Sequence, residues 1–221
     1  ATMHFSIFQV LSAKYDAIGV NKDTNFRANL NGFQIANYGN WCLGMSAYSK
    51  WLYENKSDLL YGYYEDTVAA EVAQEAHSQI NQSVVGLFGL AMDLYLAADL
   101  TRSSYYDVCN ALIVSGMPQV VGMVDVDFYP LDVPAHAVVA YAIQDGDVLI
   151  YDNNYPGEEK ILETDIFCGF KYETYDLFLL LDSAIKFEDF DIIYSKYIPA
   201  ADNFIEVALL SGTINGQTID V

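Results

Sequence analysis

The sequence predicts an α+β fold in which the helices come first along the chain and the strands follow. Apolar residues recur at helical spacing until about Gly116, and beyond it short stretches rich in β-branched and aromatic residues are separated by Gly, Pro or Asp turns. Hydrophobic residues make up 53% of the 221 residues, which is enough for a substantial core. Because helices and strands do not alternate, an alternating α/β sheet is not expected. We predict one domain over residues 1–221, with a mainly helical lobe (1–116) and a mainly β lobe (117–221).

Four helices are predicted in the first lobe. A Gly- and Asn-rich loop over residues 32–41 precedes the first one, which begins at Cys42 with "CLGMSAYSKWLYENK". The second covers "DTVAAEVAQEAHSQI" and opens with the capping pair Asp66 and Thr67. A third covers residues 84–100. The fourth follows "TRSS", an N-cap signature, and ends near Gly116.

Five strands are predicted in the second lobe: "PQVVGMVDV", "HAVVAYAI", "DVLIYDN", "YDLFLLLD" and "FIEVALLS". The "QDGD" segment, residues 144–147, predicts a tight hairpin between the second and third of them. The tail "SGTINGQTIDV" indicates one more strand pair, or the beginning of a segment that continues beyond this chain.

The formal charge of −20 argues against a nucleic-acid partner, because a uniformly acidic surface repels phosphate backbones. The most apolar stretch, "VVGLFGLAMDLYLAADL", is interrupted by Asp93 and Asp99 and is too short for a membrane span. The first residues, "ATMHFSIFQV", lack the basic start and long apolar core of a signal peptide. "ATM" has the look of a trimmed start, so this chain could be one domain of a longer protein.

The three cysteines do not form a disulfide framework or a CxxC metal site. Cys109 and Cys168 lie in apolar stretches and are expected to be packing residues. The carboxylates of "DVDFYPLD" (Asp125, Asp127 and Asp132) lack the glycine and distal glutamate of a calcium loop, so a solvated loop and no metal are predicted. The tyrosines of "YGYY", residues 61–64, suit core packing better than a peptide groove.

Cys42 differs from the other two cysteines because it stands where the first helix begins. The unpaired N–H groups and the dipole of a helix N-terminus stabilise a thiolate, which is the form of cysteine that acts as a nucleophile. Buried structural cysteines also open helices, so Cys42 becomes a candidate nucleophile only if a base and an oxyanion donor are available.

The candidate base is His136, at the head of the "HAVVAYAI" strand, where it shares one face with Val138 and Ala140. His4 lies near the chain end, and His77 alternates with polar residues on a helix, where a solvated side chain is expected. Beyond the hairpin, "DVLIYDNNYPG" returns Asp152 beside the histidine strand. A carboxylate there can orient the imidazole and stabilise the imidazolium, although Asn153 and Asn154 are chemically able to do the same.

The "NYGNWCLGMS" segment, followed far downstream by "PAHAVVAYAIQDGDVLIYDNNYPGEEK", resembles papain-like cysteine peptidases, especially the bacterial peptidase C39-like branch. The resemblance spans roughly residues 32–157. It implies a helical lobe whose central helix starts at the cysteine and an antiparallel β lobe that carries the histidine and the Asp or Asn. It also implies a catalytic triad of Cys42, His136 and Asp152 that hydrolyses peptide bonds through a thioester intermediate.

One position departs from the pattern that this resemblance implies. Papain-like enzymes usually carry a glutamine six residues before the cysteine, and its side chain donates to the oxyanion; Ala36 stands there in this chain. Asn37 is the predicted substitute, with Gln34 and Asn40 as neighbouring amides, together with the Cys42 backbone N–H. Loss of one such donor costs on the order of 10²–10³ in rate.

The same residues are compatible with two further functions. A Cys-His-Asp site also serves acyl transfer, so a transglutaminase-like or amidase activity is the enzymatic alternative. The missing glutamine motivates the other alternative, a catalytically inactive papain-like binding module. The peptidase interpretation implies no cofactor and a peptide or protein substrate, and the resemblance favours a secreted or cell-surface location slightly over the cytoplasm.

Overall fold

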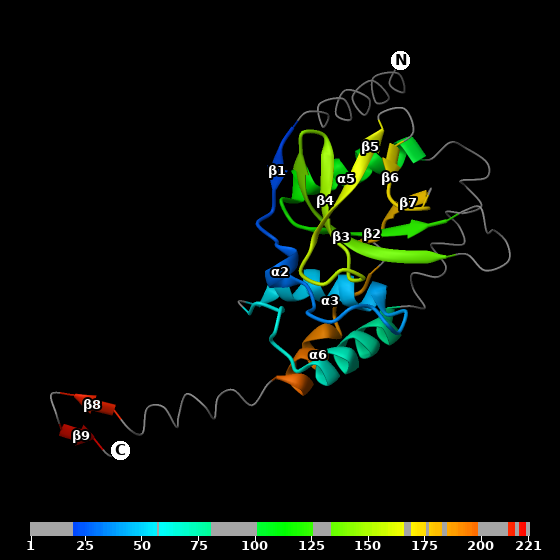
Figure 1. Cartoon of the computed structure of the whole chain (residues 1–221). Coiled ribbons are helices and arrows are strands. Elements are labelled where there is room, and N and C mark those ends of the chain that lie inside the picture. Colours follow the sequence, from blue (N-terminus) through cyan, green and yellow to red (C-terminus); the bar gives the residue numbers. More distant parts are fainter. Residues whose placement is uncertain are drawn as a thin grey trace.

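The computed structural model describes residues 20–56, 58–80, 101–125, 134–165, 169–175, 177–182, 185–198, 212–214 and 217–219. Figure 1 shows a twisted sheet with helices packed on both of its faces. All strand pairs of this sheet are antiparallel. The prediction of an α+β fold, with helices and an antiparallel sheet, is therefore confirmed.

The sheet follows the order β6-β5-β4-β3-β2-β7, and the short β1 pairs with the free edge of β3 beyond the end of β2. The strands are β1 (Lys22–Asp23), β2 (Gln119–Val124), β3 (Ala135–Gln144), β4 (Asp147–Tyr151), β5 (Glu159–Asp165), β6 (Gly169–Lys171) and β7 (Leu177–Leu180). A separate hairpin joins β8 (Gly212–Ile214) to β9 (Gln217–Ile219), which agrees with the strand pair that was one of the two interpretations of the tail. The strand predicted for "FIEVALLS" lies outside the described residues.

The predicted turn between β3 and β4 is confirmed. Gln144 pairs with Asp147, and the two residues between them, Asp145 and Gly146, have φ values of 54° and 95°. Two successive positive φ angles give the turn type whose twist matches a tight hairpin, and Asp-Gly is a preferred pair for it. The turn fixes the register of β4 on β3 and so decides where the chain arrives after β4.

The helices are α2 (Ala28–Asn31), α3 (Cys42–Asn55), an unlabelled helix over residues 66–80, α5 (Thr101–Ser115) and α6 (Phe190–Tyr197). The predicted first and second helices and the end of the fourth are thus confirmed, and the one predicted over residues 84–100 lies outside the described residues. The N-cap role of "TRSS" is wrong, because residues 101–104 already lie within α5. The prediction that Asp66 caps the helix over residues 66–80 is wrong. The carbonyl of Glu65 accepts the N–H of Ala69, which makes Glu65 the capping position, and the Asp66 carboxylate accepts a bond from Gln34 instead.

Helix α6 was not predicted, and it interrupts the expected β lobe. Its buried or half-buried residues Phe190, Ile193, Tyr194 and Tyr197 recur at helical spacing, while Ile192 points to solvent. The helix packs on the core that α3 and residues 66–80 form, and Leu179 of β7 packs against the same cluster. The strand β5 was also missed, because "EKILETD" mixes charged and apolar residues and leaves Ile161 exposed.

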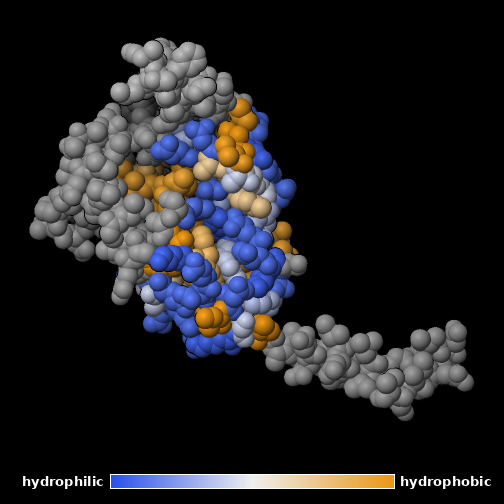
Figure 2. Space-filling view, turned by 180° about the vertical axis from the view of Figure 1, so that it is seen from behind, coloured by the Kyte–Doolittle hydropathy of each residue, from blue (hydrophilic) through white to orange (hydrophobic). Residues whose placement is uncertain are grey.

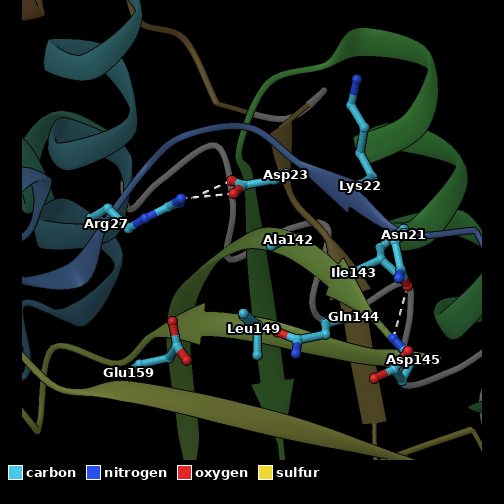
Figure 3. A pocket seen from close by; sticks show the side chains of 10 residues that line it. All are labelled: Asn21, Lys22, Asp23, Arg27, Ala142, Ile143, Gln144, Asp145, Leu149 and Glu159. Atoms are coloured by element: carbon cyan, nitrogen blue, oxygen red, sulfur yellow. Dashed lines mark hydrogen bonds and ion pairs between the residues drawn. The ribbon is translucent and has the colours of Figure 1, made fainter.

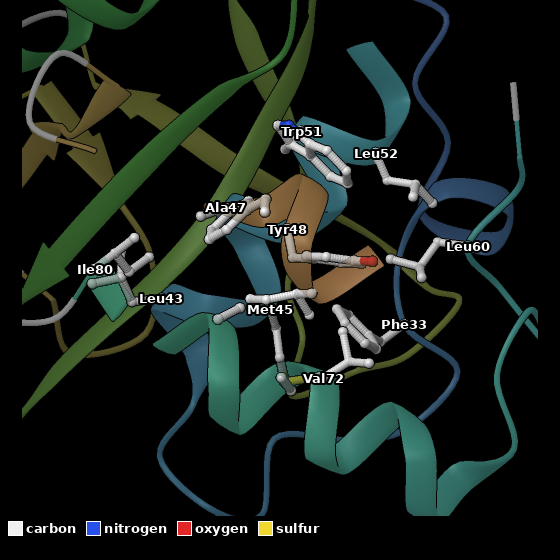
Figure 4. Close-up of a cluster of buried hydrophobic side chains, with 14 of the residues drawn as sticks. Phe33, Leu43, Met45, Ala47, Tyr48, Trp51, Leu52, Leu60, Val72 and Ile80 are labelled. Atoms are coloured by element: carbon white, nitrogen blue, oxygen red, sulfur yellow. The ribbon is translucent and has the colours of Figure 1, made fainter. Parts of the chain in front are cut away.

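Helix α3 is buried almost all round, between the sheet, residues 66–80 and α6. Figure 4 shows its side chains Met45, Tyr48 and Trp51 inside one hydrophobic cluster. The Tyr48 ring lies 5.4 Å from that of Trp51, and the buried Tyr48 hydroxyl is satisfied by the hydroxyl of Tyr64 at 2.8 Å. Because α3 is packed against neighbours on nearly every side, the core fixes its position and therefore the position of its first residue.

On the other face of the sheet, α5 covers a second hydrophobic cluster. Neighbouring residues of β3 divide between the two faces: Ala137 belongs to the cluster with α3, and Val138 and Ala140 belong to the cluster with α5. This alternation is the one predicted for the histidine strand. Hydrophilic side chains cover most of the described surface in Figure 2, with hydrophobic ones in small separate groups.

We predict that Gly44→Ala strongly destabilises the protein, because α3 crosses residues 66–80 at this glycine. A Cβ at Gly44 would lie 2.4 Å from the backbone nitrogen of His77 and 2.5 Å from the carbonyl oxygen of Ala73. Backbone atoms cannot move aside as a flexible side chain can, so the free energy of unfolding should fall by about 1–3 kcal/mol or more. Thermal or urea unfolding measures the change.

Gly62→Ala is the matched control for this prediction. The same methyl group added at Gly62 meets no atom within 4 Å, so its cost reflects only the φ of +74°, roughly 1–2 kcal/mol. Equal or greater stability of Gly44→Ala relative to Gly62→Ala would show that the helix crossing is looser than described.

Candidate active site

The structure brings three of the predicted site residues together. Cys42 is the first residue of α3, His136 is the second residue of β3, and Asp152 directly follows β4. His136 Nε2 lies 2.7 Å from Asp152 Oδ1, and the imidazole also hydrogen-bonds the Cys42 side chain. Because Nε2 is taken by Asp152, Nδ1 is the ring nitrogen that faces the sulfur.

Strand register explains why His136 and Asp152 meet. Val139 pairs with Tyr151, so continuing the antiparallel pairing by one residue places Asp152 opposite Val138. His136 and Val138 lie on the same face of β3, because successive side chains alternate. Asp152 therefore arrives on the face that carries the imidazole, diagonally across from His136 and two residue pairs along the strands.

The loop before Cys42 is ordered by Asn37. The Asn37 side-chain oxygen accepts the N–H of Trp41 at 2.7 Å, and its backbone N–H donates to the Asn153 carbonyl at 2.9 Å. Asn40 has a left-handed φ of 59°, which asparagine tolerates, and the chain then turns into α3. The loop thus presents Cys42 at a helix start, as the sequence predicted.

Two of the predicted oxyanion donors, Gln34 and Asn37, differ in how far their side-chain nitrogens are already hydrogen-bonded. The Gln34 amide nitrogen is engaged by the Tyr64 carbonyl at 2.6 Å and by Asp66. The Asn37 amide nitrogen makes only a long contact of 3.4 Å with Asn154 Oδ1. Of these two amides, Asn37 has the nitrogen less committed to other partners, and its role at an oxyanion stays a prediction.

Asp152 is completely buried and accepts three hydrogen bonds. The donors are the His136 ring, the Asn154 backbone N–H at 2.8 Å and the Tyr172 hydroxyl at 2.6 Å. Burial alone would raise the pKa of Asp152, but these hydrogen bonds and the charge of His136 outweigh it and hold the pKa below its ordinary value of 3.8. Asp152 is therefore a carboxylate at neutral pH.

His136 is buried beneath the ring of Tyr175, whose centroid lies 6.2 Å from the imidazole centroid at an interplanar angle of 22°. Burial by itself would lower the pKa of His136. Its hydrogen bonds to Asp152 and Cys42, and the charges of these two groups, more than compensate and raise the pKa to about 9. The imidazole is thus held as an imidazolium at neutral pH.

The arrangement has a clear chemical capacity. A buried imidazolium is placed between a carboxylate that orients it and a sulfur that it can stabilise as a thiolate. The same ring can deliver its Nδ1 proton to a group that leaves from the sulfur side. These are the requirements of nucleophilic cysteine chemistry.

Two residues of the site were assigned no such role by sequence reasoning. Tyr172 and Tyr175 reach the site from the turn after β6, in which the Tyr175 N–H donates to the Tyr172 carbonyl. No local signal marks them, because twenty residues of chain separate Tyr172 from its partner Asp152. Asn153 and Asn154 were considered as orienting groups for His136, but the structure gives that contact to Asp152.

The other cysteines and histidines are not part of this site. Cys109 is fully buried in α5, and burial raises the pKa of its thiol to about 12, so it is a packing residue as predicted. The expectation of a solvated His77 is wrong. It is half-buried where residues 66–80 meet α3, and burial lowers its pKa. His4 and Cys168 lie outside the described residues.

The prediction of a solvated loop over "DVDFYPLD" is wrong at Asp125. This residue is buried instead of solvated, and its backbone N–H donates to the Pro134 carbonyl. Asp127 and Asp132 lie outside the described residues. Within the ranges that the structure describes, no group of three or more His, Cys, Asp or Glu side chains is arranged to hold a metal ion. Tyr64 of "YGYY" is buried in the core.

A separate hollow of about 480 Å³ lies at the far end of β3. Figure 3 shows charged side chains around it, including Lys22, Glu159 and the Arg27–Asp23 pair, whose charged atoms are 2.7 Å apart. Its residues on β3, from Ala142 onward, are roughly 20 Å or more along the strand from His136. The hollow is therefore distinct from the Cys42 site.

A scan against models of protein families, a search of curated proteins and a search of solved structures each find no match for this chain. None of the helices in the described part of the chain combines the length and apolar character needed to cross a membrane.

Tyr172→Phe should destabilise the protein in a pH-dependent way. The change removes the hydroxyl that donates to the buried Asp152 carboxylate, which should lower the free energy of unfolding at pH 7 by about 1–3 kcal/mol. Because the folded-state pKa of Asp152 is lowered, its contribution is present above pH 3.8 and is lost as the pH falls through that lowered pKa. Urea unfolding from pH 7 to pH 2 should show the two proteins converging.

Tyr175→Phe provides the control on the same turn, since it removes a hydroxyl but keeps the ring that stacks on His136. A loss of the same size and pH dependence in both variants would contradict a specific bond between Tyr172 and Asp152.

His136 should make stability depend on pH in the opposite direction. Its folded-state pKa of about 9 lies above the ordinary value of 6.5, so its contribution is complete below pH 6.5 and is lost as the pH rises through 9. The difference in free energy of unfolding between wild type and His136→Ala should shrink across this range by on the order of 3 kcal/mol. A constant difference from pH 6 to pH 10 would mean that His136 is neutral in the folded protein.

Proposed function

We propose that this protein is a cysteine peptidase with a papain-like fold. The observation that carries the proposal is the hydrogen-bonded chain from the Cys42 thiol through the His136 imidazole to the buried Asp152 carboxylate. Each member has the partner that nucleophilic catalysis requires, and the three come from α3, β3 and the end of β4. The substrate is a peptide or protein, and the reaction needs no cofactor.

The proposed reaction begins with attack by the Cys42 thiolate on the carbonyl carbon of a peptide bond. A C–S bond forms, and the electron pair of the C=O bond moves to oxygen. When this pair returns, the C–N bond breaks, and the leaving amine takes the proton from His136 Nδ1. The acyl group is then a thioester on Cys42.

Hydrolysis of the thioester reverses these roles. Neutral His136 takes a proton from a water molecule, whose oxygen attacks the thioester carbon, and the C–S bond breaks to release a carboxylic acid and the thiolate. Asp152 stays ionised throughout. It keeps Nδ1 turned toward the sulfur and balances the imidazolium charge, which its lowered pKa favours.

The first proposed donor to the oxyanion is the backbone N–H of Cys42. Cys42 is the first residue of α3, so its N–H has no acceptor within the helix, and the helix dipole favours negative charge there. Asn37 Nδ2 is the second proposed donor, in the place of the glutamine that Ala36 replaces.

The order of the elements that carry the three site residues also supports the papain-like assignment. The cysteine opens a buried helix that packs on an antiparallel sheet. The histidine begins a strand, and the aspartate follows the next strand of the same hairpin. These are the placements that the sequence resemblance implies, and they arise here from strand register and helix packing.

Labelling with iodoacetamide at pH 7, followed by peptide mapping, tests the proposal. We expect rapid modification at Cys42, and Cys109 serves as an internal control because its buried thiol should not react. His136→Ala should slow the labelling of Cys42 at least about tenfold, since a unit charge a few Å from the sulfur is worth several times the free energy of a tenfold change.

Casein digestion extends the test to the reaction itself, with Cys42→Ser as the inactive control. Cleavage by the wild type alone would support the peptidase. Slow labelling that His136→Ala leaves unchanged, together with no cleavage, would contradict it and favour a binding module. Incorporation of an amine into a glutamine peptide without cleavage would redirect the assignment to acyl transfer.

A further inference from the structure

We propose that Asn153 is a positioning residue that sets the distance between the Cys42 sulfur and the His136 imidazole; this inference rests on the proposed function. Asn153 is fully buried, and its side-chain nitrogen reaches three oxygens. These are the Cys42 carbonyl at 3.1 Å, the Ser46 hydroxyl at 3.0 Å and the Ala137 carbonyl at 2.9 Å.

These three contacts join the two elements that carry the reacting groups. The Cys42 carbonyl belongs to the residue with the thiol, and the Ala137 carbonyl belongs to the residue directly after His136. A single amide group therefore ties the first turn of α3 to the start of β3. Ser46 adds a second link between the same elements, because its hydroxyl donates to the Ala137 carbonyl at 2.8 Å.

The chemistry of the three acceptors requires a hydrogen-bond donor at this position, and the two N–H groups of Asn153 Nδ2 are shared among them. Two of them are carbonyl oxygens, which can only accept, and the Ser46 proton is already used on Ala137. An acceptor atom placed there would face lone pairs and leave buried oxygens unsatisfied. The surrounding oxygens therefore favour a short side chain that ends in a hydrogen-bond donor, and Nδ2 of Asn153 is such a donor.

Asp152 and Asn153 stand at the turn that follows β4, in which the Tyr155 N–H donates to the Asp152 carbonyl at 3.0 Å. The Asp152 side chain bonds His136 of β3, and the Asn153 side chain holds the start of α3. The backbone of Asn153 also takes part, since its carbonyl accepts the Asn37 N–H of the loop before Cys42. The "DNN" segment thereby connects the base, the nucleophile and the nucleophile's loop.

This arrangement predicts a functional effect beyond stability. Misplacement of a reacting group by about 1 Å can cost on the order of 10² in rate. Loss of the Asn153 amide removes the direct link at the Cys42 carbonyl, so the sulfur should move relative to the imidazole even while the helix core keeps α3 folded.

A double-mutant cycle on the labelling rate of Cys42 by iodoacetamide separates positioning from general stabilisation. The four proteins are the wild type, Asn153→Ala, His136→Ala and the double variant. We expect Asn153→Ala to slow labelling about tenfold or more, and His136→Ala to add little in that background. Residues that act through one geometry show such non-additive effects, whereas independent ones multiply.

Asn31→Ala is the matched control, because Asn31 is also a buried asparagine but bonds the Arg27 N–H in a different part of the fold. Its effect and that of His136→Ala should multiply. Circular dichroism at the assay temperature checks that each variant is folded. If Asn153→Ala does not fold, Ser46→Ala removes the second link and one of the three Asn153 contacts but keeps the bond to the Cys42 carbonyl. It should show the same coupling to His136 with a smaller effect.

The outcomes distinguish this inference from the proposed function. If wild-type labelling depends on His136 but the effects of Asn153→Ala and His136→Ala multiply, Asn153 is only structural and the inference is overturned, while the peptidase proposal stands. If wild-type labelling is slow and independent of His136, the proposed function fails and this inference fails with it.

Discussion

The buried contact between His136 and Asp152 is the constraint on which the rest of the site depends. A carboxylate and an imidazolium can be kept out of water only where each has a charged partner and further hydrogen bonds. Asp152 meets that condition through His136, Tyr172 and the Asn154 backbone N–H. Since these donors come from separate strands and turns, the sheet must be complete before the pair is stable. The charge state of His136 therefore depends on the assembled sheet and on Cys42 at the start of α3.

The second constraint is the burial of α3. Its apolar residues contact the sheet, residues 66–80 and α6, so the core determines where Cys42 lies. Because Gly44 has no side chain, the backbone of the helix over residues 66–80 can pack directly against the backbone of α3. The sheet places the base and the helical core places the nucleophile, and the side chains of Asn153 and Ser46 connect the two.

Sequence reasoning located Cys42, His136 and Asp152 because each stands at a recognisable element boundary: a helix start, a strand start and a strand end. The tight "QDGD" turn made the return of Asp152 toward His136 predictable from local rules. It did not find Tyr172, α6 or the burial of Asp125. Those features depend on contacts across long stretches of chain, for which periodicity and turn residues carry no signal.

The sequence by itself determined the α+β class, the helices and hairpin that carry the candidate site, and the identity of three polar residues within it. Only the tertiary structure decided which of Asp152, Asn153 and Asn154 meets the imidazole, because this depends on strand register and on which face each side chain takes. It also decided that Asn37 orders the loop before Cys42 and that Tyr172 supports Asp152. The physical reason is that hydrogen-bond partners are chosen by three-dimensional proximity, which local sequence patterns do not encode.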